Sequence, residues 1–167
     1  LFQDNEGLMW FRTYDGVNCY DGKSMEVFRS DFSEQKTLSN NIIHSIQQAD
    51  SSCLWITTHL GVNRFSQDSR QVVGYYDFTG DYYLHSNPKG DTWVVSDEGI
   101  FYYNTYHKKF VHLKNIETPV ENMDQRAFVT DDGVLWTFPR NTGSLIQCSL
   151  DGFDRDTLSV HPTVSSS

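Results

Sequence analysis

Apolar residues along the chain form short runs that polar turns separate, and a tryptophan lies in four of these runs. The tryptophans are Trp10, Trp55, Trp93 and Trp136, so they lie 45, 38 and 43 residues apart. Each follows a polar turn, and a glycine comes six residues later, or seven in the last copy. A repeat of about 40–45 residues with one periodic aromatic is typical of β-propeller blades, which have four strands each.

The second copy shows the strands of a blade most completely. Isoleucines in Ile42–Ile46 predict a first strand, and the continuous apolar run Cys53–Thr57 predicts a strand buried on both faces. After Gly61 the chain turns, so Val62–Phe65 is expected to form the third strand and Val72–Phe78 the outer fourth strand. No run keeps apolar residues at helical spacing over three turns, which favours an all-β fold.

The other copies map onto this order. The first copy is predicted to lack its first strand. The remaining strands are predicted at Leu8–Thr13, Val17–Tyr20 and Met25–Arg29 in the first copy, at Tyr82–Ser86, Thr92–Ser96, Ile100–Asn104 and Lys109–Leu113 in the third, and at Arg126–Thr130, Val134–Phe138, Leu145–Leu150 and Leu158–Val160 in the fourth. We therefore predict a β-propeller fragment of about four blades, each a four-stranded antiparallel sheet, at approximately 1–37, 38–78, 79–115 and 116–160.

Two kinds of recurring residue are expected to be structural. The tryptophans should be buried between blades, because an indole removes a large apolar area from water. The glycines should provide the positive φ of a tight hairpin, which other residues adopt only at a cost. This structural set is Trp10, Trp55, Trp93 and Trp136 with Gly16, Gly61, Gly99 and Gly143. Since propellers usually close with four to eight blades and little sequence precedes the first tryptophan, we interpret the segment as part of a longer protein.

The stretch 38–65 resembles the regulator-type (two-component regulator) β-propeller repeat of periplasmic sensors. In that family the repeat reads approximately Leu, Ser or Pro, Asn, Ile or Val, then an Asp-Gly turn, Leu-Trp-Ile-Gly-Thr, and Gly-Leu-Asn-Arg-Tyr or Phe. The matching residues are Leu38-Ser39-Asn40-Asn41-Ile42, Leu54-Trp55-Ile56-Thr57-Thr58 and Gly61-Val62-Asn63-Arg64-Phe65. Other copies depart from the repeat: the first has Phe11-Arg12 in place of Ile-Gly, the third has Ser96 in place of Thr, and the fourth has Pro139 and one more residue before Gly143.

The resemblance implies a sensor function. Such repeats make up the ectodomains of hybrid two-component systems of gut Bacteroidetes, where propellers followed by an immunoglobulin-like domain detect glycan fragments outside the inner membrane. It implies a periplasmic, extracytoplasmic location and an oligosaccharide ligand. It also implies that the full-length protein is a homodimeric histidine kinase, although this segment has no kinase motif and is not expected to contact the membrane directly.

Composition excludes several other partners. The chain has 22 acidic and 13 basic side chains, a formal net charge of −9, and no basic cluster longer than Lys108-Lys109. A nucleic-acid partner is therefore not expected. Three cysteines, Cys19, Cys53 and Cys148, are widely spaced and are expected to be small buried side chains rather than disulfide partners. If a terminal blade lacks its neighbour, its exposed face or edge should cause self-association.

The sequence offers no catalytic or metal motif. The six histidines form no HExxH or zinc-like spacing, there is no GxSxG, and the acidic stretch Asp151–Asp156 lacks the pattern of a calcium loop. No catalytic residue, metal or cofactor is expected, which favours a non-catalytic sensor or binding module. A propeller enzyme, such as a lyase or glycoside hydrolase, and a purely structural interaction propeller stay open as alternatives, because fold alone does not decide function.

The ligand is expected at one end of the blades. Hairpins between second and third strands, and links from one blade to the next, should emerge together there, where side chains can vary while the strands stay fixed. The candidate residues are Tyr14, Asp15, Asn40, Asn41, His59, Asp97, Glu98, Arg140 and Asn141. Aromatic, carboxylate, amide and guanidinium groups stack on sugars or hydrogen-bond to them, and Arg140 and His59 are the strongest candidates. The alternative is that all are ordinary solvated hairpin tips.

Overall fold

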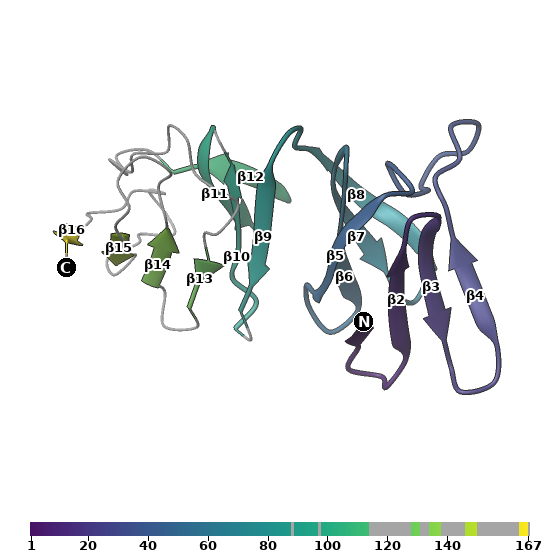
Figure 1. The fold of residues 1–167 in the computed structure, drawn as a ribbon. Coiled ribbons are helices and arrows are strands. Elements are labelled where there is room, and N and C mark those ends of the chain that lie inside the picture. The colour runs from purple at the N-terminus through teal and green to yellow at the C-terminus, as the bar shows by residue number, and fades with distance from the viewer. Residues whose placement is uncertain are drawn as a thin grey trace. The chain divides into compact units, whose positions relative to one another are not determined.

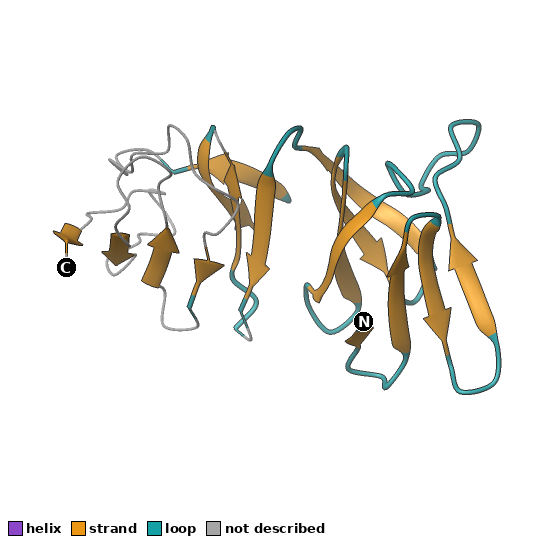
Figure 2. Cartoon of the chain, viewed as in Figure 1, coloured by secondary structure: helices purple, strands orange, loops and turns teal. Residues whose placement is uncertain are grey.

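The computed structural model describes residues 1–87, 89–96, 98–113, 128–130, 134–137, 146–149 and 164–166. The chain forms two compact units, Leu1–Thr79 and Gly80–Ser167. Every regular element in the described residues is a β-strand (Figure 2). The strands form four antiparallel sheets of four strands, and within each sheet the spatial order follows the chain (Figure 1). These sheets, called blades one to four below, confirm the predicted all-β fold.

The first unit contains blades one and two. Blade one consists of β1 (Phe2–Gln3), β2 (Met9–Thr13), β3 (Gly16–Tyr20) and β4 (Met25–Phe28). Blade two consists of β5 (Ile43–Gln48), β6 (Cys53–Thr58), β7 (Gly61–Ser66) and β8 (Gln71–Asp77).

The second unit contains blades three and four. Blade three consists of β9 (Tyr82–Ser86), β10 (Thr92–Ser96), β11 (Gly99–Asn104) and β12 (Lys109–His112). Blade four consists of β13 (Phe128–Val129), β14 (Val134–Thr137), β15 (Ile146–Ser149) and β16 (Val164–Ser166).

Two strand predictions need correction, and a third lies outside the described residues. Blade one does have a first strand, β1, which pairs with β2 through Phe2 and Trp10; its two residues are too few to show an alternating pattern. Strand β5 begins at Ile43, and Ile42 lies just before it, where its backbone N–H bonds to the side chain of Asn40. The strand that pairs with β15 is β16, whereas the predicted strand at 158–160 lies outside the described residues.

The core of the first unit lies between blades one and two. The Trp10 ring stacks on Phe28 at 5.8 Å and meets the edge of Phe65 at 5.7 Å, so blade one contributes an indole to the face of blade two. Leu54 and Ile56 from β6 complete this cluster and are fully buried. Burying one indole contributes about 4–6 kcal/mol before the entropy of ordering is subtracted, which explains why the tryptophan recurs.

The predicted structural tryptophans and glycines can be located in the described part of the chain, with the exception of Gly143. Trp55 and Trp93 are buried in β6 and β10, whereas Trp136 in β14 is half-buried. Glycines follow β2, β6 and β10 at the predicted places, with φ of +100° at Gly16 and +142° at Gly61. A Cβ at Gly61 would lie 2.4 Å from the carbonyl oxygen of Tyr76, so a side chain is excluded there by space as well as by φ. Gly143 lies outside the described residues.

Candidate functional site

The predicted site residues of the first unit meet at one end of blades one and two. The β2–β3 hairpin carries Tyr14 and Asp15, and Gly16 at its end donates its backbone N–H to the carbonyl of Asn41, 2.9 Å away. The β6–β7 hairpin carries His59, whose backbone N–H bonds to the carbonyl of Ile42 at 3.1 Å. The link between the blades therefore joins both hairpins. We call this surface, made of the two hairpins and residues 29–42, the hairpin end.

One local device shapes the hairpins. In β2–β3, the Thr13 hydroxyl donates to the carbonyl of Gly16 at 2.9 Å and accepts the backbone N–H of Asp15 at 3.1 Å. In the β6–β7 hairpin, the Thr58 hydroxyl likewise donates to the carbonyl of Gly61 and accepts the backbone N–H of Leu60, at 3.2 Å each. Because a hydroxyl and a glycine hold each turn, the side chains at its tip are not needed for the fold.

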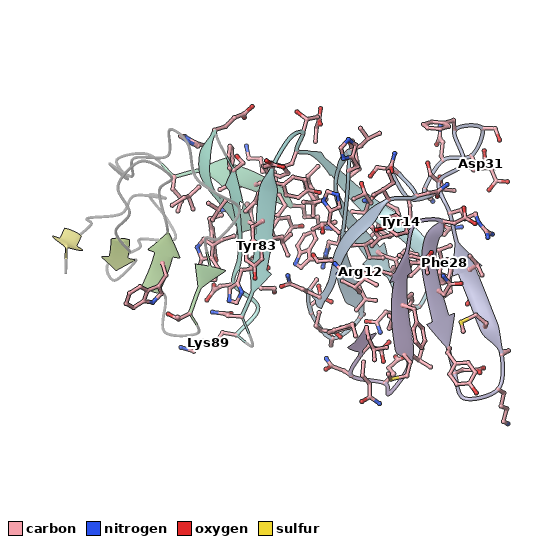
Figure 3. The ribbon with its side chains drawn as sticks, in the orientation of Figure 1. Arg12, Tyr14, Phe28, Asp31, Tyr83 and Lys89 are labelled. Carbon is pink, nitrogen blue, oxygen red and sulfur yellow. The ribbon has the colours of Figure 1, made fainter. Side chains whose placement is uncertain are left out.

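The tip residues differ in how far they are engaged. The Tyr14 side chain is 91% exposed, and Figure 3 shows it at the same end of the first unit as Asp31 of the link. Asp15 accepts two hydrogen bonds from Arg29, at 3.0 Å from Nε and 2.8 Å from Nη2. The hydrogen bond from Arg29 lowers the pKa of Asp15, so an ion pair is present at neutral pH.

Asn40 and Asn41 have structural tasks within the link. The Asn40 Oδ1 accepts the backbone N–H of Ile42 at 2.8 Å, and the Asn41 Oδ1 accepts that of Ser30 at 2.7 Å. Both side-chain carbonyls therefore order the link that positions the neighbouring hairpins. Their role in shaping the surface is visible, whereas a role in contacting a ligand stays a prediction.

Several residues at or next to the hairpin end were not predicted from the sequence. Phe32 in the link is 92% exposed, and Arg29 pairs with Asp15. His44 lies beside His59 with ring centroids 6.0 Å apart, and its carbonyl accepts a hydrogen bond from Arg12. An isolated phenylalanine in a polar link was a signal available in the sequence. His44 was not detectable, because a register shift between Ile43 and Ser45 in β5 determines its position.

In the second unit, only part of the prediction falls on described residues. Glu98 lies at the β10–β11 hairpin, where its backbone N–H bonds to the Ser96 hydroxyl at 3.2 Å. The ring of His112 from β12 lies with Nε2 3.1 Å from the Glu98 carbonyl. Asp97, Arg140 and Asn141 lie outside the described residues.

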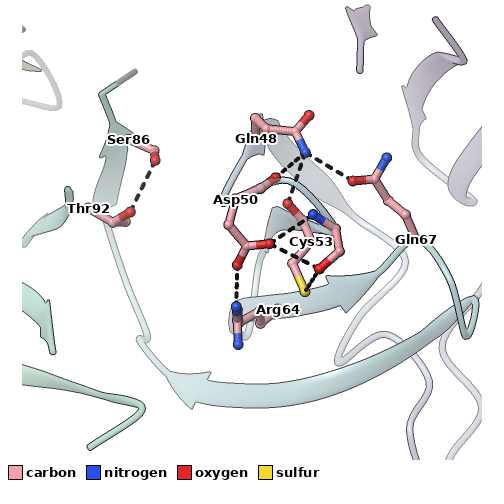
Figure 4. Close-up of polar contacts among 8 residues, drawn as sticks. Gln48, Asp50, Cys53, Arg64, Gln67, Ser86 and Thr92 are labelled. Atoms are coloured by element: carbon pink, nitrogen blue, oxygen red, sulfur yellow. Dashed lines mark hydrogen bonds and ion pairs between the residues drawn. The ribbon is translucent and has the colours of Figure 1, made fainter. Parts of the chain in front are cut away.

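The opposite end of blades one and two, the turn end, is built from buried polar side chains. Asp4, after β1, accepts hydrogen bonds from Trp10 Nε1 at 2.7 Å and from Gln67 Nε2 at 2.8 Å. The Gln67 Oε1 in turn accepts a hydrogen bond from Gln48 Nε2 at 3.0 Å. Gln48 Nε2 also donates to two backbone carbonyls (Figure 4). This network connects blade one to blade two through polar groups that have little exposure.

Asp50 at the turn end also has a structural environment. Burial alone would raise its pKa, but hydrogen bonds from the Ser52 backbone and from Arg64 outweigh burial and lower the pKa. The carboxylate is therefore ionised and paired with Arg64 (Figure 4). A paired, ionised carboxylate is not suited to general acid catalysis at neutral pH.

Metal-binding and thiol chemistry have little support in the described part of the chain. No group of three or more His, Cys, Asp or Glu side chains there could hold a metal ion. Cys19 and Cys53 are buried free thiols, and burial raises the pKa of each, which disfavours the reactive thiolate. Among the same residues, no helix is long and apolar enough to span a membrane.

Comparison with known proteins identifies similar folds. No family model and no curated protein matches the chain. The extracellular domain of BT3049 from B. thetaiotaomicron, described as a hybrid two component system, matches 98% of the chain with a TM-score of 0.71 and 22% identity. The extracellular domain of BT4673 from B. thetaiotaomicron, described as a one component system, matches 99% with a TM-score of 0.72 and 17% identity. In each case the chain spans 24% of the matched structure, about a quarter of its length.

Proposed function

We propose that this chain is part of an extracytoplasmic sensor domain of a two-component signalling protein, and that its hairpin end contributes to binding glycan fragments. The observation that carries this proposal is the likeness in fold, over nearly the whole chain, to the extracellular domain of a protein described as a hybrid two component system. In this proposal the segment is not an enzyme and lies in the periplasm. The full-length protein is an inner-membrane histidine kinase that acts as a homodimer.

The chemistry of the hairpin end supports a sugar ligand. Tyr14 and Phe32 are exposed aromatic rings on which the apolar face of a pyranose can stack. The Asp15–Arg29 pair offers a carboxylate that accepts from hydroxyls and a guanidinium that donates to hydroxyls or to a uronate. His59, on the β6–β7 hairpin of the same end, adds an exposed imidazole. These groups come from a surface whose backbone is held by other residues, so they can vary without loss of the fold.

Calorimetry with a panel of glycan fragments tests the function. The complete gene product should bind at least one fragment, and His59→Ala and Arg140→Ala should weaken that binding. His107→Ala is the matched control, because His107 is an exposed histidine on the β11–β12 turn. Unchanged affinity in His59→Ala would remove the hairpin end from the site, and unchanged affinity in Arg140→Ala would remove the contact predicted in the fourth copy of the repeat. Release of shortened or unsaturated sugar from the bound fragment would favour the propeller enzyme instead.

A further inference from the structure

Blade two shows how a blade face of this repeat is covered. On its side toward blade one, β6 and β7 present Leu54, Ile56 and Phe65, and β8 adds Val72. Phe65 is 2% exposed and Val72 is 7% exposed, because Trp10 and its neighbours in blade one pack against them. A neighbouring blade with an indole on its surface is therefore what buries this face.

The same face of blade one is uncovered. Blades one and two can be aligned on their tryptophans and on their strand pairing. In this alignment Met9 and Phe11 correspond to Leu54 and Ile56, and Tyr20 and Met25 correspond to Phe65 and Val72. Tyr20 is 37% exposed, Met25 is 54% exposed, and Met9 and Phe11 are only half-buried. We call these four residues the outer face of blade one. Four large apolar side chains at equivalent positions are thus retained on a face that nothing in the described residues covers.

An asparagine on each blade strengthens the equivalence. Asn63 in β7 is fully buried and binds the incoming link: its Oδ1 accepts the Ser39 backbone N–H at 3.0 Å, and its Nδ2 donates to the Ser39 hydroxyl at 2.9 Å. Asn18 in β3 occupies the same place, two residues after the hairpin glycine. No hydrogen bond to the Asn18 side chain is present among the described residues.

The hairpin threonines repeat this difference. Thr58 caps its own hairpin and also meets the Ser39 hydroxyl at 2.8 Å. Thr13 caps its hairpin in the same way, and its described hydrogen bonds are all within that hairpin. Blade one therefore has the apolar face, the asparagine and the threonine that receive a neighbouring blade in blade two.

We propose that the outer face of blade one binds another blade of this repeat, whose tryptophan-bearing face covers Met9, Tyr20 and Met25. The outgoing link of that blade presents a backbone N–H and a hydroxyl to Asn18, as Ser39 does to Asn63. The related extracellular domains are about four times as long as the chain, which leaves length for such a blade. This inference concerns assembly and goes beyond the proposed sensing function.

A tandem variant provides the missing blade from the protein's own sequence. Residues 1–45 are placed directly before Leu1, which repeats the tryptophan spacing of 45 and the link that contains Ser39. In the added copy, Met9→Leu and Met25→Leu give its peptides distinct masses. Peroxide oxidation of the original Met25, followed by mass spectrometry, should be severalfold slower in the tandem variant than in the 167-residue chain. Equal oxidation rates in a folded tandem variant would overturn the proposal.

Two asparagine variants give a second readout. In the 167-residue chain, Asn63→Ala should lower Tm, whereas Asn18→Ala should not. In the tandem variant, Asn18→Ala in the original copy should lower Tm about as much as Asn63→Ala does. If Asn18→Ala changes Tm equally in the 167-residue chain and in the tandem variant, the assignment of Asn18 is overturned. If the tandem variant does not fold, Met25 oxidation in the complete gene product decides: slower oxidation than in the 167-residue chain supports the added blade, and an equal rate rejects it.

Discussion

The two ends of blades one and two use polar side chains in opposite ways. At the turn end, Asp4, Gln48 and Gln67 are engaged in a network that holds the blades together. At the hairpin end, a hydroxyl and a glycine hold each turn, and the tips project Tyr14 and His59 outward. The same strands and the same core lie between the two ends.

This difference separates the residues that specify the fold from those available for recognition. A substitution at the turn end leaves a buried donor or acceptor unpaired, and that costs free energy. A substitution at a hairpin tip changes exposed groups alone and should be nearly neutral for folding. The same blade can therefore keep its core while the side chains of its hairpin end vary.

The largest effect is expected for a core residue between these ends. Trp55→Ala removes an almost fully buried indole that meets Tyr76 edge-on, with ring centroids 5.9 Å apart. The cavity should lower the free energy of unfolding by about 3–5 kcal/mol. Urea denaturation should compare this variant with Tyr14→Ala, which should change the free energy of unfolding by less than about 0.5 kcal/mol. A small effect of Trp55→Ala would mean that the indole is not part of the core.

The next effect concerns the backbone of the hairpin end. Gly61→Ala combines a strained φ of +142° with a Cβ that would lie 2.4 Å from a backbone oxygen of β8. Gly22→Ala is the matched control, since its φ is +94° but nothing lies within 4 Å of the added Cβ. Backbone strain of this kind costs about 1–3 kcal/mol. Thermal denaturation should therefore show the larger loss for Gly61→Ala, and equal losses would mean that the close approach has no role.

A similar or somewhat smaller effect should follow from opening the turn-end network. Asp4→Ala leaves the indole N–H of Trp10 and the amide of Gln67 without their acceptor, which should cost about 1–3 kcal/mol. Asp4→Asn should be more stable than Asp4→Ala, because an asparagine can keep the hydrogen bonds that Asp4 accepts from the backbone N–H groups of its turn. Asn87 does so at the equivalent turn position of blade three, where it accepts two backbone N–H groups. Equal stability of both variants would show that the acceptor is unimportant.

The ion pair at the hairpin end should have the smallest effect. The folded-state pKa of Asp15 is lowered by Arg29, so the pair stabilises above the ordinary carboxyl pKa and is lost as pH falls through the folded value. Both side chains are exposed, so little stability depends on the pair. A carbon-detected NMR titration should show the Asp15 pKa rising in Arg29→Gln. An unchanged pKa would place the two side chains apart in solution.

Repetition explains how much of this structure was predictable. Trp10 and Trp55 recur with their turns and glycines, so they revealed the sheets and the hairpin positions, including Tyr14 and His59. Strand β1 was missed because two residues show no periodicity. The partners of the hairpin end were missed for another reason: Arg29 meets Asp15 across 14 positions, and a register shift sets the place of His44. Such contacts depend on tertiary packing, which a single sequence does not encode locally.

The central claim is that the hairpin end, and not exposed aromatic surface in general, binds the ligand. Calorimetry on the complete gene product, with a glycan fragment that binds it, should compare Tyr14→Ala, Tyr14→Phe and Tyr106→Ala. Tyr106 is the matched control, because it is 88% exposed on the β11–β12 turn. We predict that Tyr14→Ala weakens Kd about tenfold, equivalent to about 1.4 kcal/mol, that Tyr14→Phe retains most affinity, and that Tyr106→Ala changes nothing. Unchanged Kd for Tyr14→Ala, or an equal loss for Tyr106→Ala, would contradict the account.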